Sequence, residues 1–346
     1  MNKIPVAILG ATGAVGQKFI LLLSNHPQFV IHELVASEKN EGKRYQDAVH
    51  WIQSTDIPPQ ICNIIIKSTD DSLHSPLLFS GLSSNIAGPI ETKYAQSGHI
   101  IMSNAQDHRM DDTVPLIIPE INHEHFELIH TQPYRGKIIT NSNCVTMLLS
   151  LVLAPLHTKF GIDHIAVTTM QAVSGAGYPG VPSFDIMGNI LPYIPMEEEK
   201  IESEPQKILG TLKGKKISPA PINISAQCYR TAVRDGHTFS LAIKFKNKPK
   251  QNELENTLTT FIGYPQIHSL YSAPSHPVHV SHTQSRPQPL LDASKDRGMV
   301  VTVGRIRSCT IFDYKMTVVG HNTIRGAAGA SILNAECYLD LGYPLS

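Results

Sequence analysis

Cys144 stands where a thiol can act as a nucleophile. It follows the polar residues "NSN" at the end of an apolar, strand-like run from Lys137, and a long apolar segment follows it. Asn143 or Ser142 can cap the first turn of a helix that begins there. The positive end of the helix dipole lowers the pKa of a thiol in that turn and favours the thiolate. The alternative is a small buried cysteine at a strand-to-helix turn.

A thiolate nucleophile needs a proton partner, and His237 is the candidate. It ends the turn sequence "DGH", directly before a run in which apolar and polar residues alternate. The near-neutral pKa of imidazole suits general acid–base catalysis. The chain has 17 histidines, and the others are expected to be exposed or structural. The stretches "NHEHFELIH" and "HPVHVSH" lack the spacing of a zinc site, so no metal is predicted.

The loop "GATGAVG" follows a strand pattern and opens a helical one. Glycines let the backbone approach a pyrophosphate closely, and the N-terminus of the following helix offers N–H donors. The spacing GxxGxxG is a variant of the commoner GxGxxG, and a plain tight turn is the alternative. The predicted phosphate cradle comprises Gly10, Thr12, Gly13, Ala14, Val15 and Gly16.

The end of the second predicted strand indicates which dinucleotide binds. In NAD-binding proteins an acidic residue usually contacts the adenosine ribose there. Here Ser37 stands at the strand end, close to three cations, Lys39, Lys43 and Arg44. A hydroxyl and cations suit a 2′-phosphate and favour NADP, whereas Glu38 favours NAD.

Alternating strand and helix patterns in the first 140 residues would position this loop. The periodicity predicts strands near residues 5–10, 31–37, 77–82, 99–105 and 137–142. It predicts helices after the glycine loop and from about Ile90 to Gly98. Such alternation is typical of a Rossmann-like, doubly wound parallel α/β sheet.

The middle of the chain has a different pattern. One long strand is predicted over residues 162–175, and alternation predicts strands within 238–250, 299–307 and 310–320. A sheet with one wet face has this signature. Residues 177–221 are interpreted as loop-rich, and residues 322–342 are helical in pattern. We expect a second, α+β domain on a mostly antiparallel sheet in residues 144–322, and a first domain of residues 1–143 plus 323–346.

Composition limits the class of protein. The chain of 346 residues is long enough for two domains. A formal net charge of zero gives no basic surface for nucleic acid, and no apolar run approaches the roughly 20 residues that span a bilayer. The apolar stretch after Lys3 is too short for a signal peptide. Five widely spaced cysteines without a CxxC pair indicate a reduced, cytoplasmic protein.

Eight motifs occur in order along nearly the whole chain: "GATGAVGQ", "SNAQDHRM", "VPLIIPEIN", "SNCVTM", "QAVSGAGYPGV", "EEEKIESEPQKILG", "CYRTAVRDGHT" and "HNTIRGAAG". Together they resemble the aspartate-β-semialdehyde dehydrogenase family, in its archaeal and fungal branch. The resemblance implies NADPH-dependent reduction of β-aspartyl phosphate to aspartate semialdehyde through a thioester, a step toward lysine, methionine and threonine. It implies small-molecule substrates and a homodimer or homotetramer, with the second domain serving catalysis and dimerisation.

The resemblance assigns catalytic and cofactor roles to single residues. Cys144 matches the nucleophile, His237 the acid–base histidine, and Gln171 the glutamine that orients the intermediate. Asn322 in "HNTIRG" matches a cofactor contact, and could instead cap a helix. The loop "SGAG" matches one that lets the nicotinamide approach the cysteine, through Ser174, Gly175 and Gly177.

The resemblance also assigns substrate contacts. Arg230 in "CYR" matches the arginine that binds the α-carboxylate, for which a planar guanidinium is suited, although Arg234 stands close by. In "MEEEKIE" an ExxK pair is implied, with the acid on the substrate ammonium and the lysine near phosphate. Glu197 and Lys200 fit that pair, and Glu198 and Glu199 remain alternatives.

Phosphate binding is implied for Arg109 in "SNAQDHR", assisted by Asn104 and Asn143. The chain departs from the family where Lys39 replaces a frequent arginine and Asn40 a frequent serine. Two kinds of alternative function stay open. The first is a reductase of another acyl donor, malonyl-coenzyme A or N-acetylglutamyl phosphate, which would not need the ammonium-binding acid. The second is an NADPH-binding protein without turnover, which would need neither the cysteine nor the histidine.

Overall fold

The computed structural model describes residues 3–345, which form two compact units. The first unit contains the chain up to Ile117, then Glu124–Asn141, and the chain from Ala327 onward. The second contains Ile118–His123 and Ser142–Gly326. The chain therefore passes between units after Asn141 and Gly326, where the sequence suggested boundaries after residues 143 and 322. No sequence pattern pointed to the short segment Ile118–His123.

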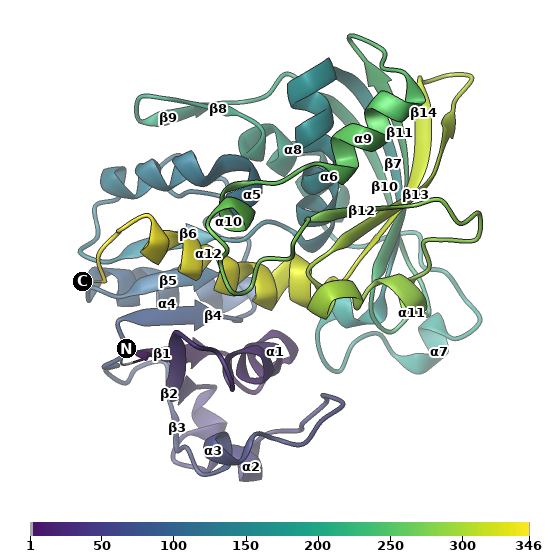
Figure 1. The fold of residues 1–346 in the computed structure, drawn as a ribbon. Helices are drawn as coiled ribbons and strands as arrows, with labels where there is room; N and C mark the ends of the chain where they lie inside the picture. Colours follow the sequence, from purple (N-terminus) through teal and green to yellow (C-terminus); the bar gives the residue numbers. More distant parts are fainter. Residues whose placement is uncertain (1–2, 346) are drawn as a thin grey trace. The chain divides into compact units, whose positions relative to one another are not determined.

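The first unit is built on six parallel strands. Their order is β3-β2-β1-β4-β5-β6, so chain order reverses between β1 and β4 (Figure 1). This arrangement confirms the predicted doubly wound sheet. The strands are β1 (Ile4–Leu9), β2 (Phe29–Val35), β3 (Ile66–Lys67), β4 (Leu77–Ser80), β5 (Ile100–Ser103) and β6 (Lys137–Thr140).

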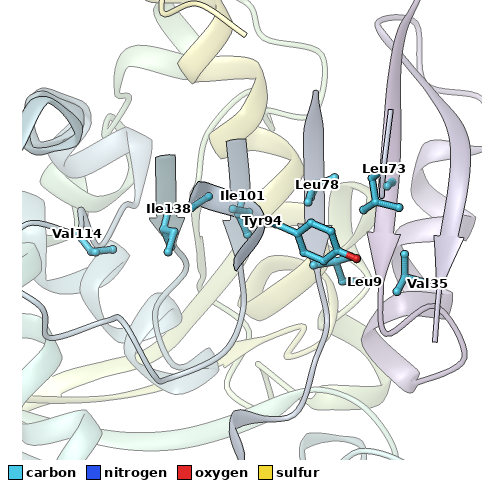
Figure 2. Close-up of a cluster of buried hydrophobic side chains, with 10 residues drawn as sticks. Leu9, Val35, Leu73, Leu78, Tyr94, Ile101, Val114 and Ile138 are labelled. Atoms are coloured by element: carbon cyan, nitrogen blue, oxygen red, sulfur yellow. The ribbon is translucent and has the colours of Figure 1, made fainter. Parts of the chain in front are cut away.

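Helices cover both faces of this sheet, because neighbouring strand residues point to opposite faces. Leu78 packs with Tyr94 of α4 (Ser84–Gln96) in the buried cluster of Figure 2. The ring of the next residue, Phe79, lies 5.1 Å from that of Phe19 in α1 (Ala14–Leu23). The other helices of this unit are α2 (Tyr45–Ala48), α3 (Pro59–Cys62) and α12 (Gly329–Asp340), of which α12 contacts β5.

The second unit is built on a mixed sheet in the order β10-β7-β11-β14-β13-β12 (Figure 1). The four central strands pair antiparallel, and the two edge strands pair parallel with their neighbours. The second sheet is therefore mostly antiparallel, as predicted. Its strands are β7 (Ile162–Gln171), β10 (Asn223–Arg230), β11 (His237–Phe245), β12 (Val278–Ser281), β13 (Val301–Ser308) and β14 (Tyr314–Gly320).

One face of this sheet is buried and the other is exposed to solvent. Along β11, Phe239 and Leu241 are buried, whereas Ser240 and Lys244 are exposed. Within residues 3–345, no helix has the length and apolar character needed to cross a membrane.

The remaining α-helices and strands belong to the second unit. They are α5 (Pro119–Asn122), α6 (Cys144–Phe160), α7 (Ser183–Ile186), α8 (Glu197–Ile208), β8 (Thr211–Lys213), β9 (Lys216–Ser218), α9 (Gln251–Thr259), α10 (Tyr264–Ile267) and α11 (Pro289–Asp292).

Three expectations from the sequence were wrong. Helix α4 begins at Ser84 rather than Ile90, because it accommodates Pro89 in its interior. Strand β7 ends at Gln171, and Val173–Ala176 form a 3₁₀ turn instead of continuing the strand. The loop-rich interpretation of residues 177–221 missed α8. That helix is strongly polar and contains Pro205, and both features favoured a loop over a helix.

Candidate active site

Cys144 is the first residue of α6 and is half-buried. The side chain of Asn143 caps the helix, because its Oδ1 accepts the N–H groups of Val145 at 2.9 Å and Thr146 at 3.1 Å. A Cβ on Gly326 would lie 2.7 Å from the Cβ of Cys144, so this glycine permits the close approach. The predicted N-cap is confirmed, and the thiol lies at the positive end of a helix dipole.

His237 faces the sulfur. Its Nε2 lies 3.1 Å from Cys144 Sγ, and its Nδ1 accepts the backbone N–H of Ala172 at 3.0 Å. Since an amide N–H can only donate, Nδ1 carries a lone pair. The proton of the neutral ring is therefore on Nε2 and points at the sulfur.

Burial keeps this imidazole neutral. His237 is completely buried, and removal from water lowers its pKa to about 3, with further lowering by the charges of Arg230 and His321. A neutral ring that donates to sulfur stabilises the thiolate form of Cys144.

Glu197 connects the residues around the thiol. Its Oε1 accepts the side-chain N–H groups of Asn143 at 2.9 Å and Gln171 at 3.0 Å, and its Oε2 lies 3.8 Å from Lys200 Nζ. The two neighbouring glutamates lie elsewhere. Glu198 accepts the backbone N–H of Cys228 in β10, and Glu199 is exposed. Of the three consecutive glutamates, Glu197 alone joins the network around the cysteine.

Arg230 ends β10 and is only 6% exposed. Its Nη1 donates to the carbonyl oxygen of Ala172 at 2.9 Å. Burial lowers its pKa, while the charges of Cys144 and Glu197 act in the opposite direction, so the guanidinium lies near both. The side chain of Arg234 is 76% exposed and lies 3.6 Å from Asp235. Of these two arginines, the buried Arg230 is therefore the one that lies beside Cys144 and Glu197.

Asn322 holds two turns beside His237. Its Oδ1 accepts the N–H of Gly236 at 2.9 Å, and its Nδ2 donates to Ser174 Oγ at 2.7 Å. Gly175 lies over the site, since a Cβ there would be 2.9 Å from Arg230 Nη1. Gly177 is exposed, with a φ of +73°. Asn322 therefore braces the turns that carry Ser174 and His237, and its contact with a cofactor stays a prediction.

The glycine loop of the first unit fits a dinucleotide phosphate. Gly10 has a φ of +74°, and a Cβ there would lie 2.8 Å from the carbonyl oxygen of Gly81. A Cβ on Gly16 would strike the carbonyl oxygen of Gly10. The N-cap residue of α1 is Gly13, which has no side chain to compete with a phosphate for the N–H groups of the first turn.

Two further predicted sites lie in the first unit. Ser37 and Lys39 are exposed just after β2, where a 2′-phosphate was predicted. Arg109 is buried, and its Nη2 donates to the backbone oxygen of Asn104 at 2.7 Å. The side chain of Asn104 donates to Ser80 O at 3.0 Å and accepts from Asn141 at 3.1 Å. Across the described part of the chain, no cluster of three or more histidine, cysteine or acidic residues could hold a metal.

The second unit thus brings together Cys144, His237, Gln171, Asn143, Glu197, Lys200 and Arg230. Sequence reasoning missed two contributors. Ala172 contributes only backbone groups, which leave no sequence signal. Glu204 is buried and accepts the N–H of Asn143 at 2.7 Å. Its position seven residues after Glu197, two turns along one helix face, was the available signal.

Sequence profiles of one family match both units. The profile described as "Semialdehyde dehydrogenase, NAD binding domain" matches residues 5–129, and the one described as "Semialdehyde dehydrogenase, dimerisation domain" matches residues 153–325.

Relatives match over nearly the whole chain. The aspartate-semialdehyde dehydrogenase of Methanothermobacter thermautotrophicus is 44% identical, over 96% of this chain and 97% of that protein. The Saccharomyces cerevisiae enzyme of the same name is 43% identical, over 96% of both chains. The crystal structure of the Candida albicans enzyme with NADP superposes with a TM-score of 0.90 at 39% identity, over 98% of this chain and 99% of that one.

Proposed function

The chain belongs to the aspartate-semialdehyde dehydrogenase family, in its archaeal and fungal branch, and we propose that it catalyses NADPH-dependent conversion of L-4-aspartyl phosphate to L-aspartate 4-semialdehyde and phosphate. It is an oxidoreductase that uses NADP, and its product is a precursor of lysine, methionine and threonine. The observation that carries the proposal is the 3.1 Å contact between Cys144 Sγ and His237 Nε2 at the N-terminus of α6.

Cys144 is proposed to attack the acyl carbon, so that phosphate leaves and a thioester remains. Covalent catalysis of this kind divides one difficult reduction into two easier steps. Bound NADPH supplies the hydride that reduces the thioester. The residues proposed to bind it are those of the glycine loop, Ser37 and Lys39 at the 2′-phosphate, and Ser174, Gly175, Gly177 and Asn322 at the other end.

The charged residues suit the two ends of aspartyl phosphate. Arg230 is proposed to bind the α-carboxylate through its planar guanidinium. Glu197 is proposed to bind the ammonium, and its contact with Gln171 supports a role for that glutamine in orienting the intermediate. The phosphate is assigned to Lys200, Asn143, Arg109 and Asn104, which supply cationic or amide donors.

The test is phosphate-dependent reduction of NADP⁺ by L-aspartate semialdehyde, followed by absorbance, with NAD⁺ measured in parallel. We expect a signal that requires phosphate and that is stronger with NADP⁺. Turnover of malonyl-coenzyme A or N-acetylglutamyl phosphate in place of this substrate would show a different acyl donor. NADPH binding without turnover of any of these would show a silent site.

We also propose that the protein is a cytoplasmic homodimer or homotetramer that associates through the second unit. Large apolar side chains are more than half exposed there, at Tyr178, Phe184, Met187, Ile190, Tyr193 and Met196. The family profile that matches residues 153–325 is described as a dimerisation domain, which supports association through this unit. Light scattering after size-exclusion chromatography gives the molar mass, and a value of 38.0 kDa, that of one chain, would contradict the proposal.

A further inference from the structure

We propose that Tyr45 and Gln17 position the glycine loop for the pyrophosphate of NADP, by holding two successive carbonyl groups of the loop away from the ligand. The inference rests on the use of NADP in the proposed function and deepens it. Both side chains belong to the first unit and are buried, so they act through the backbone of the loop and are positioning residues.

Tyr45 holds the first of these carbonyl groups. Its hydroxyl donates to the carbonyl oxygen of Ala11 at 2.9 Å. The ring is completely buried, and burial raises the pKa of the hydroxyl, so the group stays protonated and can donate. In a trans peptide unit the C=O and the following N–H point in opposite directions. The N–H of Thr12 therefore points away from the buried tyrosine.

Gln17 holds the second carbonyl group. Its Nε2 donates to the carbonyl oxygen of Thr12 at 3.0 Å and to that of His50 at 2.9 Å. Its Oε1 accepts the N–H of Ile52 at 2.9 Å. Because both the oxygen and the nitrogen of this amide are bonded to backbone, its orientation is fixed, and with it the direction of the Thr12 carbonyl group.

These two bonds leave donors of the loop available to a ligand. The N–H of Gly13 closes the turn by bonding the carbonyl oxygen of Gly10 at 3.0 Å. Among residues 3–345, by contrast, no group accepts a hydrogen bond from the N–H of Thr12, Ala14 or Val15. Unpaired N–H groups at the start of a helix bind phosphate. If the carbonyl groups could turn freely, an oxygen would face the phosphate instead of a donor.

Neighbouring groups hold Tyr45 in turn. Its backbone N–H donates to the carbonyl oxygen of Ile64 at 2.9 Å, and its ring lies edge-on to that of Trp51, with 6.4 Å between the ring centres. The tyrosine also directly follows Lys43 and Arg44, two of the cations near the predicted 2′-phosphate site. Replacing it could therefore affect the glycine loop or this cationic segment, and the test has to separate the two effects.

The test measures the binding of NADP⁺ and of adenosine 2′-monophosphate by isothermal titration calorimetry. The second nucleotide carries the 2′-phosphate but lacks the pyrophosphate. We expect Tyr45→Phe, and separately Gln17→Met, to raise the dissociation constant of NADP⁺ by about tenfold, as for the loss of one hydrogen bond to a charged group. The dissociation constant of adenosine 2′-monophosphate should not change, because this ligand does not reach the glycine loop.

Tyr94→Phe is the matched control. Tyr94 is another buried tyrosine of the first unit, and its hydroxyl donates to the carbonyl oxygens of Thr69 at 3.1 Å and Asp71 at 3.2 Å. Its replacement should lower the melting temperature and leave the dissociation constants of both nucleotides unchanged. A rise for NADP⁺ equal to that in Tyr45→Phe would overturn the proposal, because it would show a general loosening of the fold.

The other outcomes are also decisive. An unchanged dissociation constant for NADP⁺ in a folded variant would overturn the role of the residue replaced. An equal rise for the two nucleotides would overturn the proposal, because the effect would then lie in the cationic segment. If one variant fails to fold, the other still tests the loop. No turnover is needed, so the result stands even if the phosphate-dependent assay fails, whereas a wild type that does not bind NADP⁺ would refute the cofactor and the proposal together.

Discussion

A single carboxylate oxygen organises the residues beside the thiol. Glu197 Oε1 accepts from both Asn143 and Gln171, which lie on different elements of the second unit. Successive helix residues point about 100° apart, so Glu198 and Glu199 cannot share this position. The choice among three consecutive glutamates therefore depends on where α8 begins and which face it buries, and neither is evident from the residues alone.

Replacing the nucleophile should separate chemistry from binding. Cys144→Ala removes the group that forms the thioester, so turnover should fall to background. NADP⁺ should still raise the melting temperature, because the glycine loop is untouched. Cys309→Ala, at another half-buried cysteine, is the control and should keep wild-type activity. Residual turnover in Cys144→Ala, measured in the phosphate-dependent assay, would assign the nucleophile to another residue.

Arg230 is buried and Arg234 is exposed, and this difference predicts different kinetic effects of replacing them. Arg230→Lys keeps the charge but loses the planar fork, so the KM for aspartate semialdehyde should rise by roughly tenfold or more, given about 1.5–3 kcal/mol for a charged hydrogen bond. Arg234→Lys, at an exposed position, should leave KM unchanged. The opposite result would move the carboxylate contact to Arg234.

At the scale of elements, α8 supports the N-terminus of α6. Glu197 and Glu204 lie two turns apart on one face, and they bind the side chain and the backbone N–H of Asn143 respectively. A polar helix therefore holds the residue that caps the catalytic turn. This coupling explains why two carboxylates are buried in a strongly polar helix.

Replacing Glu204 should lower the free energy of unfolding, because its carboxylate bonds the N-cap residue of α6. Glu204→Ala leaves the buried N–H of Asn143 without its acceptor, which costs about 1–3 kcal/mol. The free energy of unfolding in urea should fall by that amount. Glu199→Ala, on the exposed side of α8, should change it by less than about 0.5 kcal/mol. Equal stability of the two variants would show that the contact between Glu204 and α6 contributes nothing.

The sequence was most informative where one side-chain pattern determines one element. Alternation of apolar and polar residues predicted β11, and the order of strand, glycine loop and helix predicted the turn at Gly10. It was uninformative where backbone groups or distant packing decide the structure. Nothing in the residue type of Ala172 indicates that its N–H meets His237. By its local preference, Pro205 favours a loop. It nevertheless lies inside α8, because burial of Ile201 and Ile208 outweighs that preference.

At the scale of the whole molecule, two buried glutamates give stability opposite dependences on pH. For Glu33, burial acts to raise the pKa, but hydrogen bonds from Lys67, Ser75 and His74 outweigh it and lower the pKa to about 2. Its stabilisation is present above the unfolded pKa and is lost as pH falls toward 2. For Glu91, which accepts from Ser103 Oγ at 2.8 Å, burial dominates and raises the pKa.

A neutral replacement of Glu91 should therefore raise the stability of the folded state most at high pH. The folded state holds the Glu91 proton more tightly than the unfolded chain. Its contribution to stability is fully present below about pH 4.3 and is lost as pH rises through the folded pKa. Glu91→Gln cannot ionise, so its melting temperature relative to wild type should rise from about pH 4.5 to about pH 8. Glu33→Gln is the matched control, and its melting temperature relative to wild type should fall as pH rises from about 2 to 5. A Glu91→Gln difference that is constant with pH would mean that this carboxyl group ionises equally in both states.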